Sequence, residues 1–83
     1  MQDERELDHA RSLVRESEKQ IEFQQKIIAA LRNTSRPTRA AEKFLLRLQD
    51  TLQARRDHRD AMAAKLYGLE FEAARPETGQ PEA

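Results

Sequence analysis

Two histidines, His9 and His58, are the side chains best suited to proton transfer or metal binding in this 83-residue chain. A metal site needs converging ligands at a defined spacing, such as two histidines four residues apart on one helical face, and neither histidine has such a neighbour in the sequence. The absence of cysteine excludes disulfides, thiolate metal sites and thiol nucleophiles. No glycine-rich phosphate loop is present either. We therefore expect no catalysis and no bound metal or cofactor.

A second candidate site consists of four basic residues, which are suited to contact the phosphate backbone of a nucleic acid. Their spacing of three and four residues places them along one side of a helix start: Arg36, Arg39, Lys43 and Arg47, called the basic face below. The zero net charge of the chain, the scarcity of aromatic residues and the lack of a nucleic-acid-binding motif argue against this interpretation. A solvated helix surface is the expected structure, and nucleic-acid association remains the alternative function.

The elements that carry these residues are predicted to be two long helices. Apolar side chains recur at steps of three and four residues, a repeat typical of helices whose apolar seam faces a partner helix. The seam positions are Leu7, Ala10, Val14, Ser17, Ile21, Gln24, Ile28 and Leu31 in the first segment, and Ala41, Leu45, Leu48, Leu52, Arg55, Arg59, Met62, Leu66 and Leu69 in the second. Composition agrees, because 36% of the residues are charged while glycine (2) and proline (3) are scarce.

The first helix is predicted over about residues 3–32. Asp3 is a plausible N-cap, with Glu6 as its capping-box partner. Asn33 suits the left-handed position that follows a helix end, and residues 33–37 are rich in turn-forming types. The sequence therefore predicts a short loop after the first helix.

The second helix is predicted over about residues 38–67, with Ser35 or Thr38 as its cap and Gly68 as its C-terminal stop. Together the helices make an all-α antiparallel hairpin, a single domain over residues 1–75 that includes a possible extra turn at 69–74. Residues 76–83 are polar, contain proline and lack periodicity, so a disordered tail is expected there. Residues 68–83 hold one basic and four acidic side chains, and this end of the chain is acidic.

Two alignments of the antiparallel helices compete. The charge pair Glu6–Lys65 favours the first. An alignment shifted by one heptad is favoured by two other pairs, Glu18–Arg56 and Arg32–Glu42. The tight loop favours the first alignment.

Arg55 and Arg59 occupy seam positions in the middle of the second helix. One interpretation is an anion site or a register-setting ion pair with a carboxylate of the first helix, such as Glu18. We prefer the interpretation that their aliphatic stems pack across the seam while the guanidinium groups reach water, because an unpaired buried arginine is costly.

An apolar stripe flanks the seam on one side. Its members are Leu13, Phe23, Ile27, Ala30 and Phe44, called the apolar stripe below. Exposed apolar surface of this extent usually marks a protein–protein interface, although Leu13, Ile27 and Phe44 would also suit a widened seam. Two helices alone rarely bury enough apolar surface to make a stable fold, so we favour the interpretation that the apolar stripe is a protein–protein interface. The predicted partner is a second copy, giving a four-helix bundle, or another helical protein.

The favoured function is thus a non-enzymatic interaction module in the cytoplasm. The first twenty residues lack the apolar core of a signal peptide, and no apolar run approaches the ~18 residues that a membrane-spanning helix needs. Neither a membrane association nor a small-molecule substrate is expected.

The chain resembles a group of short, uncharacterised helical proteins found in proteobacteria, mainly in the alpha subdivision. Residues 9–66 carry the resemblance, through Glu18, Ile21, Gln24 or Gln25, Ile28, Leu31, Thr38, Ala41, Glu42, Leu45, Leu46, Leu48, Leu52, His58, Arg59 and Asp60. The turn departs from that group, because Ser35-Arg36-Pro37 stands where the group has a Gly-His-Asp type of turn. The resemblance implies a helical hairpin and a bacterial cytoplasmic setting, and it implies no activity.

Overall fold

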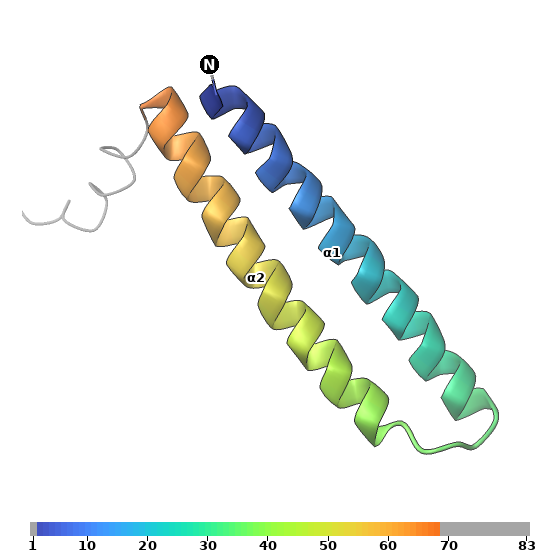
Figure 1. The fold of residues 1–83 in the computed structure, drawn as a ribbon. Helices are drawn as coiled ribbons and strands as arrows, with labels where there is room; N and C mark the ends of the chain where they lie inside the picture. Colours follow the sequence, from blue (N-terminus) through green and yellow to red (C-terminus); the bar gives the residue numbers. More distant parts are fainter. Residues whose placement is uncertain (1, 69–83) are drawn as a thin grey trace, which may run out of the picture.

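A computed structural model describes residues 2–68 and contains two helices, α1 (Gln2–Asn33) and α2 (Arg39–Tyr67). They run in opposite directions and pack side by side as a hairpin (Figure 1). The described residues contain no strand, so the predicted all-α architecture with two paired helices is confirmed. The predicted turn at 69–74 and the predicted tail at 76–83 lie outside the described residues.

The loop between the helices begins with a Schellman motif. The Arg36 N–H donates to the Leu31 carbonyl at 2.8 Å, and the Ser35 N–H donates to the Arg32 carbonyl at 3.0 Å. Ser35 adopts the left-handed conformation, with φ 57°. The prediction that Asn33 is the left-handed residue was wrong. α1 continues through Asn33, and the left-handed residue whose turn satisfies the last helix carbonyls comes two positions later, at Ser35.

Helix starts also differ in detail from the expected capping. α1 already includes Gln2, so Asp3 lies within the helix and is not its N-cap. Thr38 holds the N-cap position of α2, and Ser35 does not. The Thr38 hydroxyl donates to Oε2 of Glu42 at 3.0 Å instead of accepting from a backbone N–H, and the Glu42 N–H donates to the Thr38 carbonyl at 2.8 Å.

Gly68 ends α2 as predicted, in the left-handed conformation with φ 73°, and its N–H donates to the Ala64 carbonyl. A Cβ built at this position meets no atom within 4 Å. The position therefore selects glycine for its backbone conformation and not for lack of space.

Substitutions at the two left-handed positions, Gly68 and Ser35, are expected to change the free energy of unfolding in opposite directions. Gly68→Ala is expected to lower the free energy of unfolding by about 1 kcal/mol, because alanine is strained at positive φ. Ser35→Gly is expected to raise it by up to about 1 kcal/mol, since the same strain is then removed. Thermal unfolding followed by circular dichroism at equal chain concentration measures both changes. Equal and same-sign shifts in the two variants would contradict this account.

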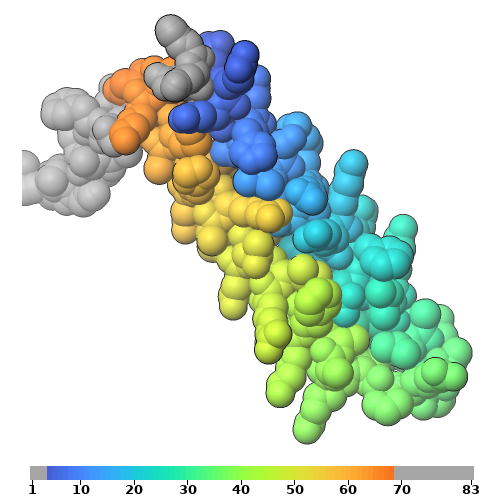
Figure 2. Space-filling view, in the orientation of Figure 1, coloured from blue at the N-terminus to red at the C-terminus, as the bar shows by residue number. Residues whose placement is uncertain are grey.

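The core is the seam between the helices. Every described seam position is buried or half-buried, which agrees with the repeat in the sequence. The buried side chains are Leu7, Ala10, Val14, Ser17, Gln24 and Ile28 of α1 and Leu52 of α2. The space-filling view shows the helices in contact along the whole hairpin (Figure 2). Such a two-helix layer buries few large apolar side chains, so its stability rests on a small core.

Contacts across the seam fit the first predicted alignment. Arg55 lies at the level of Leu13 and Ser17, and Glu6 and Lys65 line the same surface hollow. The ion pairs Arg32–Glu42 (2.8 Å) and Arg56–Glu18 (3.4 Å), which were assigned to the shifted alignment, are formed as well. Long arginine side chains reach carboxylates about one turn away from the residues they face, so these pairs do not discriminate between the alignments.

Within residues 2–68, neither helix has the length and apolar character that crossing a membrane requires.

Candidate interaction surfaces

Arg55 crosses the seam and binds the backbone of the opposite helix. Its Nη1 donates to Ser17 Oγ at 2.8 Å and to the Leu13 carbonyl at 3.0 Å, and lies 4.0 Å from Oε1 of Glu16. The sequence analysis did not predict these bonds to the opposite helix, and the Arg55 side chain keeps an exposed fraction of 29%. The small Ser17, only 1% exposed, leaves room for the guanidinium and supplies an acceptor, so the charge is not left unpaired.

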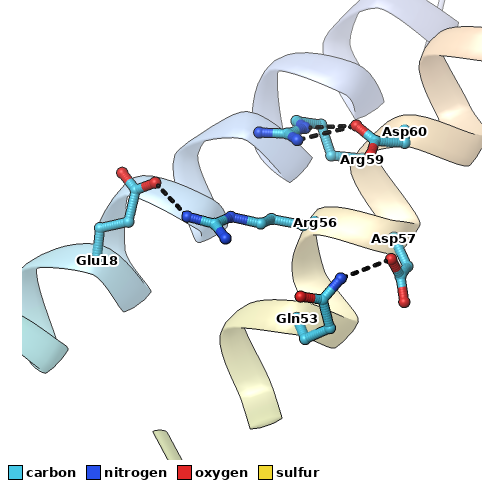
Figure 3. A network of polar contacts seen from close by, with 6 residues as sticks. All are labelled: Glu18, Gln53, Arg56, Asp57, Arg59 and Asp60. Carbon is cyan, nitrogen blue, oxygen red and sulfur yellow. Dashed lines mark hydrogen bonds and ion pairs between the residues drawn. The ribbon is translucent and has the colours of Figure 1, made fainter. Parts of the chain in front are cut away.

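Arg59 behaves differently from its neighbour one turn away. Its Nε and Nη2 donate to Oδ1 of the adjacent Asp60, both at 2.9 Å, and the Asp60 side chain is exposed (Figure 3). The guanidinium thus stays at the surface, as the sequence predicted. Arg56 reaches across to Glu18 on the same side of the hairpin, where this exposed pair adds little stability.

A second polar crossing lies nearer the loop. Gln24 is 7% exposed, and its Nε2 donates to the Ala41 carbonyl at 3.0 Å. Gln24 and Arg55 therefore tie the two helices together at two levels through side-chain bonds to backbone carbonyls. These bonds favour one alignment of the helices over shifts along the seam, because a shift would leave buried polar groups unpaired.

The apolar stripe lies at the surface of the hairpin. Phe23 is 65% exposed and Phe44 is 49% exposed, Ala30 is also exposed, and Leu13 and Ile27 are half-buried. The spacing of Phe23, Ile27 and Ala30 places these three on one face of α1. Seam widening accounts for Leu13 and Ile27, and it does not account for the two phenylalanines.

A hollow between the helices continues the apolar stripe toward the middle of the hairpin. The surface exposed in this hollow is almost entirely apolar. The residues that line it are Ala10, Leu13, Thr51, Ala54, Arg55 and His58, the polar ones through their apolar atoms. Small side chains on α2, Thr51 and Ala54, create this space beside Leu13. Bulky side chains near the loop and a hollow two to three helical turns away thus lie on the same flank.

Two further exposed apolar side chains were missed by the sequence analysis. Leu46 is 61% exposed and Tyr67 is 54% exposed. Both immediately follow a seam position, so they point away from the seam, and a search of the seam and its flanks passes over them. An apolar residue interrupting an otherwise charged outer face is the signal that would have found them.

The basic face surrounds Leu46. Arg36, Arg39, Lys43 and Arg47 are all exposed, and none pairs with a carboxylate among the residues whose side chains the structure describes. Leu46 lies three residues after Lys43 and seven after Arg39, so it shares their side of α2. Arg39, Lys43, Arg47 and Leu46 are thus exposed together on the first turns of α2, whereas Arg36 lies in the loop before this helix and not on the helix face that the sequence predicted.

The two histidines line one surface hollow although they are far apart in sequence. His9 and His58 line one hollow with Arg5, Glu6 and Met62 near the ends of the helices opposite the loop. No group of three or more metal-ligating side chains occurs in the described part of the chain. The pair of histidines is therefore a surface feature of the apolar flank, with basic and acidic neighbours.

Comparison of the chain with protein-family models, with curated proteins and with solved structures gave no match. The geometry of the hairpin is therefore the basis of the functional proposal.

Proposed function

We propose that this protein is a non-enzymatic interaction module that associates with a second copy of itself through the apolar stripe, forming a four-helix bundle. The exposure of Phe23 and Phe44 beside the half-buried Leu13 and Ile27 carries this proposal. Contiguous apolar surface on a small protein is characteristic of a binding site. Covering it with a copy of the same face gives a closed, two-fold arrangement.

The shape of the flank supports pairing with a second copy. Phe44 precedes Thr51 and Ala54 by seven and ten residues, which is about 10–15 Å along α2. A two-fold axis passing between these levels brings Phe44 of one copy to the hollow of the other, and the reverse. Each copy thus offers both a bulky side chain and a space that fits it.

The small core supports association for an energetic reason. Leu52 is the one buried side chain of α2, and the other described seam residues of this helix are half-buried. A single core in a domain of this size rarely supplies more than about 3–5 kcal/mol. Each large apolar side chain moved from water into an interface adds roughly 1.5–3 kcal/mol before ordering costs, so a dimer is substantially more stable than one hairpin.

Sedimentation equilibrium over a wide concentration range tests the proposal. The apparent mass is expected to rise from one chain of 9.6 kDa to two, and the thermal midpoint is expected to rise with concentration. A compact monomer at all concentrations would contradict self-association. The alternative function, nucleic-acid binding, is tested on the same samples by titrating DNA and RNA oligonucleotides at several salt concentrations, because phosphate contacts weaken steeply with ionic strength.

A further inference from the structure

A row of exposed side chains runs along α2 on the flank that carries Phe44 and the apolar hollow. Steps of four and three residues place its members on one face of the helix. The members, called the α2 row below, are Ala40, Phe44, Arg47, Thr51, Ala54 and His58, and all of them are exposed in the single hairpin. Large and small side chains both occur in the α2 row, and their order restricts how a second copy can pack on it.

The α2 row is complementary to itself when a second copy packs on it in the opposite direction. A two-fold axis at the level of Gln49 lies between Phe44 and the hollow, as the proposed dimer requires. The residues that then face each other between the copies are Phe44 and Ala54, Ala40 and His58, and Arg47 and Thr51. Because a larger side chain faces a smaller one at each level, the two α2 helices can approach to about 8–10 Å.

His58 is the titratable side chain that this packing covers. It lines the apolar hollow in the single hairpin. In the dimer, Ala40 of the other copy lies over His58, while Phe44 of that copy fills the hollow about one turn away. The methyl group of Ala40 leaves room for an imidazole ring and offers it no hydrogen-bond acceptor. Loss of water at this position therefore disfavours the charged form of the ring.

The charged residues around His58 also disfavour its protonation. Those that line hollows together with it are Arg55 and Lys65 of α2 and Arg5, Glu6 and His9 of α1. Glu6 is the one carboxylate of this group, and it stands against three permanent cations. The adjacent Asp57 accepts a hydrogen bond from Nε2 of Gln53, one turn earlier on α2. Arg39 and Lys43 of the other copy flank its Ala40 and add further positive charge.

We infer that the self-association, on whose existence this inference rests, is pH-sensitive and that His58 is the group through which protons act. Histidine ordinarily changes its charge between about pH 5 and pH 8. Because the dimer favours the neutral ring, separation of the two copies at acidic pH is coupled to proton uptake. The dimer is therefore strongest above this pH range and weakens as the pH falls through it.

Sedimentation equilibrium of the full chain at about pH 7.5 and about pH 5.5 tests this coupling. The dimer dissociation constant is expected to be roughly tenfold higher at the lower pH, because each copy contributes one covered histidine. His58→Gln, which does not titrate, is expected to remove most of this rise. His9→Gln is expected to remove less than half of it, because His9 does not line the apolar hollow. The helical signal in circular dichroism shows at each pH that the hairpin stays folded.

A parent dimer that is equally tight or tighter at the lower pH overturns the role of His58 and leaves the proposed function standing. The same holds if His58→Gln keeps the full rise. A rise that His9→Gln abolishes overturns the assignment to His58. A parent chain that is monomeric at both pH values overturns the proposed function together with the pH dependence.

A second pair of variants tests the contact between Ala40 and His58 at about pH 7.5. Ala40→Leu places a larger side chain over the His58 ring of the other copy and is expected to raise the dissociation constant roughly tenfold. Ala29→Leu is the matched control, because Ala29 lines a hollow on the other side of the seam with Gln25 and Arg32. Its dissociation constant is expected to stay within about threefold of the parent. Equal effects of the two substitutions would overturn the contact, and with it the burial that makes the dimer pH-sensitive.

Discussion

Leu52→Ala is expected to lower the free energy of unfolding by about 2–4 kcal/mol. Leu52 is 9% exposed and is the buried member of α2. Removing its branched side chain leaves a cavity in the one buried position that this helix contributes to the seam. In a domain with a stability of only a few kcal/mol, this loss leaves much of the protein unfolded at room temperature.

The helical signal in circular dichroism and the midpoint of urea unfolding measure this effect at a fixed chain concentration. Leu46→Ala is the matched control, because it makes the same substitution in the same helix at a side chain that is 61% exposed. It is expected to change the free energy of unfolding by no more than about 0.5 kcal/mol. Equal losses in the two variants would show that Leu52 is not the buried side chain of this helix.

Phe44→Glu is expected to raise the dimer dissociation constant by about a hundredfold or more. The side chain is 49% exposed in the single hairpin and becomes covered in the proposed dimer. Each copy loses roughly 1.5–3 kcal/mol of apolar burial, and the two-fold symmetry doubles that loss. A carboxylate facing the apolar hollow beside Ala54 adds a desolvation penalty.

Sedimentation at matched concentrations measures the change. Tyr67→Glu serves as the control, since Tyr67 is another aromatic residue of α2 with 54% exposure, but it points away from the seam and lies outside the apolar stripe. Its dissociation constant is expected to stay within about threefold of the parent. If both substitutions weaken the dimer equally, the contact surface is the outer face of α2 and not the apolar stripe.

Sequence patterns predict the helices and the seam well, for a local reason. Apolar residues at steps of three and four fix which face of each helix is buried, and glycine at position 68 fixes where α2 ends. The left-handed residue of the loop was not predicted, because asparagine suits that conformation better than serine by type, yet Ser35 adopts it. The choice depends on where α1 stops, and hydrogen bonds from Ser35 and Arg36 back to the helix decide that.

Side-chain partners across the seam were less predictable than the seam itself. The sequence shows that Arg55 occupies a core position, but it does not show that Ser17 leaves room for a guanidinium at the same level. That depends on the alignment of the helices, which long arginines satisfy in more than one way. Phe23 and Phe44 were found because they flank the seam, whereas Leu46 was missed because it stands alone on the outer face.

The Arg32–Glu42 pair beside the loop has a consequence for how the chain folds. Its members are ten residues apart, whereas Arg55 and Leu13 are separated by 42. Closing a loop of about ten residues takes roughly 10–100 ns, and the entropic cost of closing a loop is smaller for this short separation than for the longer one. Each later turn then adds neighbours already held close by the previous one. We therefore expect contacts between the helices to form first beside the loop and then progressively away from it. The helix ends opposite the loop are the last to pair during folding and the first to separate during unfolding.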